Sequence, residues 1–209
     1  MQTLADLGLI ERNPTNDDEI SATVSLYSTA GVYVISDRWN HPDRTSYKPP
    51  DDVVYPAIVS NAQYFLRFLP RTPCRNLLDI GTGTGVAALT AAKHFAEKAS
   101  GVDIAERSCL YAEFNRKLNG LDTVTISHGD LYEPVAGQQF DRIVAHPPYV
   151  PVFRHRYIYR DGGPDGEQIV RRVIEGLPAH LAPGGMFYLM ALVSDREQDL
   201  FEQRVRRWL

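Results

Sequence analysis

The sequence predicts an α/β domain built on a doubly wound, mostly parallel sheet with helices on both faces. Short apolar segments alternate with helix-forming segments from residue 76 onward, and this alternation is typical of parallel sheets. A glycine-rich turn, Gly81 to Gly85, joins the first of these apolar segments to a helix. The 209 residues, of which 44% are hydrophobic, suffice for one such domain and a small N-terminal β/α extension.

The extension is predicted over residues 1–50 and contains a short helix and a β-hairpin. The helix falls within residues 1–19 and is expected to end near Pro14. Apolar residues alternate over residues 22–35, which predicts the hairpin. Residues 37–52 are rich in proline and in charged side chains, so a loop is expected there.

The main domain is predicted over residues 51–209 and begins with a helix at 56–69, which has Pro56 in its first turn. Five strands are predicted after it, at residues 76–80, 99–104, 123–127, 140–145 and 185–193. Four helices alternate with them, at residues 86–98, 106–119, 166–180 and 195–209, and Pro178 is expected to end the third of these early.

The composition narrows the classes of function. The formal net charge of −4 gives no support for a non-specific nucleic-acid binder. Cys74 and Cys109 form no C-x-x-C pair, so no metal site is expected, and two free thiols favour a cytoplasmic protein. The N-terminal residues do not resemble a signal peptide, and no apolar run approaches the length of a membrane span.

The glycine turn is the first candidate binding site. Gly81, Gly83 and Gly85 stand where the backbone must turn sharply and where a Cβ atom would block a ligand. A dinucleotide-binding turn would have a glycine in place of Val86. The observed spacing, with Asp79 two residues before the first glycine, resembles that of S-adenosylmethionine (SAM)-dependent methyltransferases. Asp79 would then reach the ammonium group of SAM, or would only accept hydrogen bonds within the turn.

Two further acids follow later strands. Asp103 ends the segment GVDI, where it can bind both ribose hydroxyls or else stabilise the dipole of the next helix. Asp130 can accept a hydrogen bond from the adenine amine, with Leu131 beside the ring, or else belong to an Asx-turn. The residues expected at the cofactor are Asp79, Gly81, Thr82, Gly83, Gly85, Asp103, Ile104, Asp130, Leu131 and His146.

The segment His146-Pro147-Pro148-Tyr149 follows the fourth predicted strand. Its two prolines fix φ and remove two N–H donors, so the turn is stiff and its carbonyl groups are free. It resembles the Asn/Asp-Pro-Pro-Tyr motif of amino-group methyltransferases, which methylate exocyclic amines of nucleobases or the side-chain amide of glutamine. The resemblance implies that these four residues are catalytic and that Tyr149 stacks on the planar acceptor group.

The resemblance continues beyond this motif and covers residues 51–209. The stretch Asp161 to Gly166 is similar to the one that follows the motif in release-factor glutamine methyltransferases, and the segment APGG at Ala182 to Gly185 is common across SAM methyltransferases. The chain therefore resembles a class I, small-domain methyltransferase with a Rossmann-like fold. Such domains usually close the sheet with a further strand pair, for which no residues remain here, so a fragment of a longer protein is expected.

His146 is a departure, because the family has Asn or Asp at this position. Neutral imidazole offers one donor and one acceptor. His146 can accept a hydrogen bond from a substrate N–H, act as a general base toward a hydroxyl or a protonated amine of a small molecule, or only bond to the backbone. The methyl acceptor, whether protein, nucleic acid or small molecule, stays open at this point.

The loop at residues 153–160 combines arginines with aromatic residues. It can form one wall of the pocket for an anionic or aromatic acceptor, or it can be a solvated loop. Two other functions are alternatives to methyl transfer. Val86 argues against a nicotinamide-dependent oxidoreductase, and His146 keeps open a SAM-binding module without catalysis.

Overall fold

A five-stranded parallel sheet lies at the centre of the structure, a computed structural model that describes residues 2–6, 9–13, 16–40 and 49–209. Its strands are β5 (Cys74–Ile80), β6 (Ala96–Asp103), β7 (Val124–His128), β8 (Phe140–Ala145) and β9 (Leu181–Leu189). Their spatial order is β7-β6-β5-β8-β9, so the strand order reverses between β5 and β8. Ligands of open α/β sheets bind outside the carboxyl ends of the strands at such a reversal.

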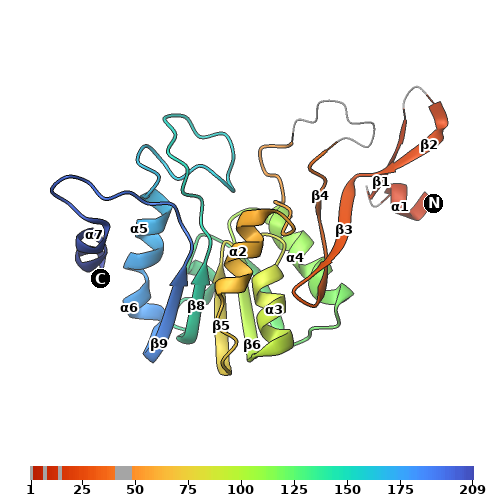
Figure 1. The fold of residues 1–209 in the computed structure, drawn as a ribbon. Coiled ribbons are helices and arrows are strands. Elements are labelled where there is room, and N and C mark those ends of the chain that lie inside the picture. The colour runs from red at the N-terminus through yellow and green to blue at the C-terminus, as the bar shows by residue number, and fades with distance from the viewer. Residues whose placement is uncertain (1, 7–8, 14–15, 41–48) are drawn as a thin grey trace.

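Helices cover both faces of this sheet, which confirms the predicted doubly wound fold (Figure 1). Successive side chains of β5 point to opposite faces. Leu77 packs in an apolar cluster with α2 and α3, whereas Leu78 packs in a second cluster with α5 and α6. The helices are α2 (Ser60–Phe68), α3 (Val86–His94), α4 (Glu106–Leu118), η1 (Glu133–Val135), α5 (Gln168–Glu175), α6 (Leu177–His180) and α7 (Phe201–Trp208).

The N-terminal residues differ from the prediction of a helix within residues 1–19. Helix α1 spans only Gln2–Asp6, and β1 (Ile10–Asn13) then pairs antiparallel with β2 (Asn16–Ala22). Residues 16–19 read NDDE and offer a helix no apolar face, whereas strand pairing satisfies the backbone groups of both segments. The helix end expected at Pro14 lies outside the described residues.

The second hairpin is where the sequence predicts it. Strands β3 (Val24–Thr29) and β4 (Val32–Asp37) are joined by two residues with positive φ, +49° at Ala30 and +84° at Gly31, as in a primed type I turn. The side chains of Val32 and Val34 are fully buried in the cluster that includes α3. The extension thus packs on the main domain, and a domain boundary at residue 50 stays a prediction. Half of the loop predicted at 37–52, residues 41–48, lies outside the described residues.

Three predicted helices are shorter in the structure. The helix predicted at 56–69 is α2, which begins at Ser60 and ends at Phe68. Helix α3 ends at His94 rather than residue 98, because Ala96 pairs with Cys74 and extends β6 toward the N-terminus. Helix α7 begins at Phe201 rather than residue 195. Before it, the Asp195 side chain accepts a hydrogen bond from the Phe201 backbone N–H at 2.8 Å. The side chain of Asp195 thereby provides a partner for one of the unpaired N–H groups at the start of the helix.

The last predicted strand and the helix before it also shift. Strand β9 spans Leu181–Leu189 rather than 185–193, because its register with β8 aligns the ends of the two strands. The helix predicted at 166–180 is divided into α5 and α6 at Gly176, and Pro178 stands in the first turn of α6. The proline therefore ends the helix early, as predicted, by starting a new one.

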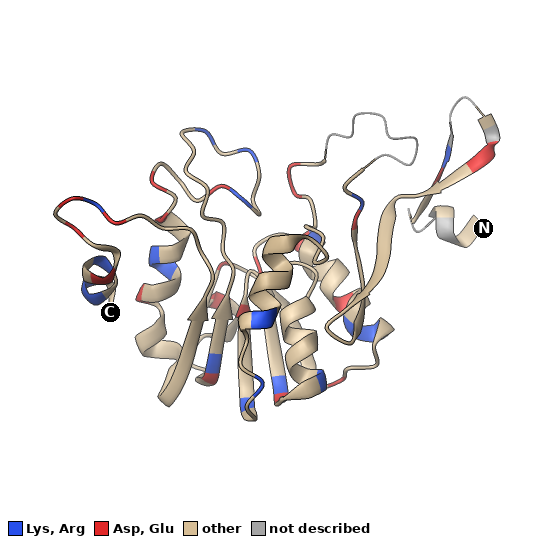
Figure 2. Cartoon of the chain, viewed as in Figure 1, with Lys and Arg blue, Asp and Glu red and all other residues tan. Residues whose placement is uncertain are grey.

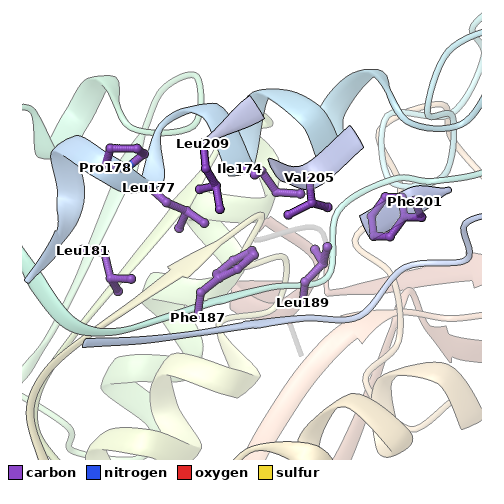
Figure 3. Close-up of a pocket in the computed structure, with 9 residues that line it drawn as sticks. All are labelled: Ile174, Leu177, Pro178, Leu181, Phe187, Leu189, Phe201, Val205 and Leu209. Carbon is purple, nitrogen blue, oxygen red and sulfur yellow. The ribbon is translucent and has the colours of Figure 1, made fainter. Parts of the chain in front are cut away.

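An apolar groove of about 500 Å³ lies between β9 and helices α5, α6 and α7 (Figure 3). It is lined by Ile174, Leu177, Pro178, Leu181, Phe187, Leu189, Phe201, Val205 and Leu209. None of these residues belongs to the site predicted from the sequence. Over the described part of the chain, β7 and β9 are the edge strands of the sheet, and the expected further strand pair stays a prediction.

The described ranges contain neither a membrane-spanning helix nor a cluster of metal ligands. No helix there combines the length and the apolar character that crossing a bilayer requires. Likewise, no group of three or more His, Cys, Asp or Glu side chains with the placement of metal ligands is found within those ranges.

Candidate functional site

The carboxyl ends of neighbouring strands bring the predicted site residues to one edge of the sheet. The register aligns Ile80, the last residue of β5, with Val102 of β6 and with the last residue of β8. Gly81, Asp103 and His146 come directly after these three positions. They therefore lie side by side along the edge, at the point where the strand order reverses.

The glycine turn is fixed to β6 by two hydrogen bonds. The backbone N–H groups of Gly81 and Thr82 both donate to the carbonyl oxygen of Val102, at 2.8 and 3.0 Å. Gly81, Gly83 and Gly85 have φ angles of +71°, +55° and +79°. Side chains are strained in this left-handed region, so the turn requires glycine at all three positions.

The three glycines differ in what surrounds them. A Cβ atom on Gly81 or Gly83 would have no heavy atom within 4 Å, so these two residues face open space. A Cβ atom on Gly85 would lie 3.0 Å from the Cβ atom of Ala112 on α4. Gly85 therefore lets the first turn of α3 pack against α4, whereas Gly81 and Gly83 leave room for a ligand beside the backbone.

Asp103 joins the end of β6 to the glycine turn. Its side chain is 9% exposed, and its two carboxylate oxygens accept hydrogen bonds from the backbone N–H groups of Gly83, at 2.8 Å, and Ala105, at 2.9 Å. Burial raises the pKa of this carboxyl. Each carboxylate oxygen can accept a second hydrogen bond. Asp103 is thus able to bind two ligand hydroxyls without releasing the turn.

Asp79 lies inside the same turn. One of its carboxylate oxygens accepts hydrogen bonds from the Thr82 hydroxyl, at 2.6 Å, and from the backbone N–H of Ala88, at 3.3 Å. Burial, with a smaller contribution from the charge of Asp103, raises the pKa of the Asp79 carboxyl to about 6 against the effect of these hydrogen bonds. The contacts are those of an acid that orders the turn, and a bound cation would favour its ionised form.

Ile104 presents an apolar surface directly after β6. Its side chain is 54% exposed, which is unusual for isoleucine beside a sheet. The ring of His128, at the end of β7, lies 3.0 Å from the Ile104 carbonyl oxygen and connects the ends of these two strands. The exposed Ile104 side chain is therefore held at the edge where the predicted cofactor residues gather.

The sequence analysis did not predict the contact that Asp130 makes. One carboxylate oxygen of Asp130 accepts a hydrogen bond from the Arg172 guanidinium on α5, at 2.7 Å. The Glu133 backbone N–H donates to the Asp130 carbonyl oxygen at 3.1 Å, which is the hydrogen bond of a β-turn over residues 130–133. Leu131 follows with a φ of +50°, which directs the chain into η1.

The turn after β8 places two rings close together. The rings of His146 and Tyr149 are nearly parallel, with centroids 5.8 Å apart and an angle of 21° between their planes. Phe65 of α2 also contacts His146, with ring centroids 5.3 Å apart. Burial lowers the pKa of the His146 imidazole below its usual value of 6.5, so the ring is neutral at pH 7. Pro147 is buried and Pro148 is half-buried.

Helix α2 supplies site residues that the sequence analysis missed. The side-chain amide of Asn61 donates a hydrogen bond to the Tyr149 hydroxyl at 3.3 Å, and Phe65 packs on His146. Asn61 and Phe65 are four residues apart and share one face of the helix. That spacing is the signal that groups them, but only the fold shows that this face meets the turn after β8.

The glycines after the turn allow a close backbone approach to Tyr149. A Cβ atom on Gly166 would lie 2.4 Å from the Tyr149 carbonyl oxygen, and one on Gly162 would lie 2.8 Å from the Tyr149 Cα atom. Val150 also forms a parallel bridge with Asp161. The stretch Asp161 to Gly166 therefore packs directly against the turn and fixes the position of its tyrosine.

Alanine at Gly85 and at Gly83 is expected to separate folding from ligand binding. Gly85→Ala adds a close contact with Ala112 to left-handed strain, and it should lower the free energy of unfolding by about 2–4 kcal/mol. Gly83→Ala adds only strain, about 1 kcal/mol, but it fills the open space and should weaken SAM binding at least tenfold. Chemical denaturation and calorimetric titration with SAM test both, and wild-type SAM affinity in Gly83→Ala would contradict the assignment.

Asp79 is expected to make stability and binding depend on pH in opposite ways. Its pKa rises from 3.8 in the unfolded chain to about 6 in the fold, so the stability it contributes below pH 3.8 is lost as the pH rises through 6. Asp79→Asn should therefore be more stable than the wild type above pH 6, by up to about 3 kcal/mol. SAM should bind the wild type less tightly as the pH falls below about 6, because the ionised carboxyl favours a bound cation.

Two measurements test this behaviour. Urea denaturation at several pH values should show that the stability difference between Asp79→Asn and the wild type shrinks toward acid pH. Calorimetry should show that the variant loses the pH dependence of SAM affinity. A wild-type affinity that is flat from acid to neutral pH would exclude a contact between Asp79 and the cation.

Comparison with known proteins finds similarity over most of the chain. Residues 57–207 match the family model described as methyltransferase small domain. A Methanocaldococcus jannaschii protein that carries the name protein N5-glutamine methyltransferase is 33% identical over 165 residues, which cover 75% of this chain and 77% of that protein. The ribosomal protein uL3 glutamine methyltransferase of Bradyrhizobium diazoefficiens is 36% identical over 54% of this chain and 40% of that protein.

A third relative is the release factor glutamine methyltransferase of Moorella thermoacetica, which is 35% identical over 56% of this chain and 46% of that protein. The matched part thus spans less than half of the length of these last two relatives. Among solved structures, SMU.776 complexed with SAH superposes with a TM-score of 0.62 at 13% identity, over 99% of this chain and 54% of that one. A SAM-dependent methyltransferase from Agrobacterium tumefaciens gives 0.54 at 19% identity, over 88% and 56%.

Proposed function

Because this chain belongs to the methyltransferase small-domain family, we propose that it transfers a methyl group from SAM to a nitrogen atom, and that the acceptor is the side-chain amide of a protein glutamine. One observation carries the proposal, which is that two turns lie next to each other. The glycine turn with Asp103 and the turn at His146 to Tyr149 follow neighbouring strands at the same edge of the sheet. The names of three relatives, all glutamine methyltransferases, support the choice of acceptor.

The residues at the ends of β5 and β6 fit SAM. The space that a Cβ atom would take at Gly81 and Gly83 is open, and Asp103 has acceptor capacity for two ribose hydroxyls. Ile104 would cover one face of the adenine. When bound, SAM supplies a methyl group that is already activated on a sulfonium, so the protein contributes orientation and exclusion of water. Residues 51–209 form the SAM-binding domain in this proposal.

The end of β7 would bind the adenine amine. Asp130 is held by Arg172 through one carboxylate oxygen, and its other oxygen would accept the hydrogen bond from the amine. Leu131 would pack beside the ring. Arg172 then acts as a positioning residue, since it orients the carboxylate without touching the ligand.

The turn after β8 would hold the acceptor amide. Tyr149, whose hydroxyl is bonded to Asn61, would stack on the planar amide group. The neutral imidazole of His146 has one acceptor nitrogen, which would accept a hydrogen bond from the amide N–H. As the amide nitrogen bonds to the methyl carbon, the electron pair of the C–S bond passes to sulfur and the nitrogen releases one proton. His146 would receive that proton.

The presence of His146 where the family has Asn or Asp favours one second candidate, which is methylation of a small molecule with His146 as general base. A base would let a hydroxyl or a protonated amine serve as the acceptor. This candidate and the first differ in the molecule that receives the methyl group.

The two free cysteines fit a cytoplasmic location, which is also a proposal.

Methyl transfer from tritiated SAM into fractionated cell extract tests the proposal. The label is expected in protein, at glutamine after complete proteolysis. Label in the small-molecule fraction alone would support the second candidate, and label in nucleic acid alone would contradict both. Retained calorimetric binding of SAM without label in any fraction would instead indicate a binding module without catalysis.

A further inference from the structure

We propose that the loop at residues 153–160, here called the arginine loop, binds the polypeptide that carries the methylated glutamine and selects segments with acidic residues beside it. This inference rests on the proposed function and extends it from the acceptor group to the surrounding chain. It is carried by the charge of the loop, by its place next to Tyr149, and by the way its rings are already packed.

The arginine loop is a basic segment in an acidic chain. The formal net charge of the chain is −4, yet no Asp or Glu occurs between Asp141 and Asp161, and the loop contains Arg154, Arg156 and Arg160. Figure 2 shows these positive segments on the loop that rises above the carboxyl end of β8. A local positive field of this kind attracts acidic partners against the overall charge of the protein.

Two of the three arginines are available to a partner. Among the described residues, Arg154 is exposed and makes no ion pair. Arg156 lies 3.9 Å from Asp51, and the two side chains are 50% and 74% exposed. Such a long, exposed ion pair contributes little, so an acidic partner residue can replace Asp51. Arg160 is bonded to the buried Asp161 at 2.8 Å and serves the loop itself.

The loop starts and ends beside the proposed acceptor site. The backbone N–H of Val150 donates to the Arg160 carbonyl at 2.9 Å, and the N–H of Gly162 donates to the Val150 carbonyl at 2.9 Å. The Arg160 end of the loop is therefore fixed beside Val150, the residue that follows Tyr149. In this proposal, the chain that flanks the methylated glutamine lies against the arginine loop.

The packing of the aromatic rings favours a polypeptide over a nucleic acid. Tyr159 stacks on Tyr55 with ring centroids 4.9 Å apart, and the guanidinium groups of Arg156 and Arg160 lie 4.8 and 5.0 Å from the ring centre of Tyr157. The ring faces that are covered in this way are not free to stack on the bases of a single-stranded nucleic acid. Tyr157 and Tyr159 instead pack against groups of the protein itself.

Apolar side chains between the arginines also suit a polypeptide. Phe153 is 96% exposed and Ile158 is 50% exposed. An acidic segment with interspersed apolar residues can pair its charges with Arg154 and Arg156 and cover these two side chains at the same time. The partner chemistry that fits is thus an acidic, partly apolar peptide segment around the glutamine.

Binding of short fluorescent peptides in the presence of S-adenosylhomocysteine tests the inference. Each peptide holds one glutamine in the same apolar context, flanked by acidic, neutral or basic residues. The acidic peptide should bind about tenfold more tightly than the basic one, and this preference should weaken with added salt. The double variant Arg154→Glu/Arg156→Glu should reverse the order of the two peptides.

The matched control is Arg71→Glu/Lys98→Glu, which changes the net charge equally at the amino ends of β5 and β6. It should keep the wild-type preference. Equal binding of all peptides, no peptide binding, or an unchanged preference in the Arg154/Arg156 variant would each overturn the inference. So would a single-stranded oligonucleotide that binds through the loop more tightly than the acidic peptide.

Methyl transfer from tritiated SAM to the same peptides separates this inference from the proposed function. Loop-dependent binding without transfer to any peptide would contradict glutamine methylation while supporting the docking surface. Transfer to all three peptides at equal kcat/KM would support glutamine methylation and contradict the selection of acidic segments. Failure of the docking inference and failure of the proposed function therefore give different results.

Discussion

Asp103→Ala is expected to weaken SAM binding about 100-fold. In the proposed complex, the variant removes the two hydrogen bonds that the ribose hydroxyls of SAM would donate to the Asp103 carboxylate, and each would contribute about 1.5 kcal/mol. Their sum, about 3 kcal/mol, corresponds to a 100-fold change in the dissociation constant. Calorimetric titration with SAM measures the change. Asp103→Asn keeps an acceptor oxygen without the charge and should give an intermediate loss of about tenfold.

Folding must be separated from binding in this experiment, because Asp103 also bonds to Gly83 and Ala105. Thermal denaturation of each variant measures that contribution. Asp122→Ala is the matched control, since it removes an aspartate that is 95% exposed and far from the glycine turn. Wild-type SAM affinity in a folded Asp103→Ala protein would exclude a ribose contact at this residue.

His146→Ala is expected to lower kcat by about 100-fold to 1,000-fold, while the affinity for SAM stays near that of the wild type. The loss follows because the variant removes the imidazole that, in the proposed mechanism, accepts the hydrogen bond and then the proton of the amide N–H. His146→Asn restores an acceptor oxygen, as in the Asn-Pro-Pro-Tyr motif that this turn resembles, and should retain activity within about tenfold of the wild type. Single-turnover rates at saturating SAM and acceptor measure these changes directly.

The pH dependence of wild-type kcat gives a second readout for His146. Burial lowers the pKa of the imidazole below 6.5, so the ring is neutral at pH 7 and becomes a donor-only cation as the pH falls. The rate at saturating SAM should therefore fall on the acid side and stay flat above neutral pH, and His146→Asn should lose this dependence. His94→Ala, at a histidine bonded to Ala30 and outside the site, is the control. Unchanged rates in both His146 variants would remove the residue from the mechanism.

The part of the site that is local in sequence could be predicted. The spacing of the three glycines before Val86 indicated the family, and the match to the methyltransferase small-domain model confirms it. The positive φ angles of these glycines show why the spacing is informative, since each one meets a backbone requirement of a single turn. The alternation of strands and helices likewise predicted the sheet, because burial on both faces makes each strand a short apolar run.

Contacts between distant segments could not be predicted in the same way. Asp130 and Arg172 are 42 positions apart, and nothing in either segment indicates that they form an ion pair. The residues at 10–22 pair as strands because each satisfies the backbone of the other, and no periodicity within one segment reveals its partner. The end of α3 and the start of β6 differ from the prediction for the same reason, since Ala96 pairs with Cys74 on another strand.

The glycine turn, the proline-stiffened turn at His146 to Tyr149 and the succession of strands along the chain could be derived from the sequence, because they depend on backbone preferences and apolar patterns within short segments. The contacts of Asn61 and Phe65 of α2 with Tyr149 and His146 could be found only in the folded structure. The same holds for the position of the arginine loop, which lies beside the turn at His146 to Tyr149. The register of the sheet and the packing of helices on it decide such contacts, and both depend on many residues at once.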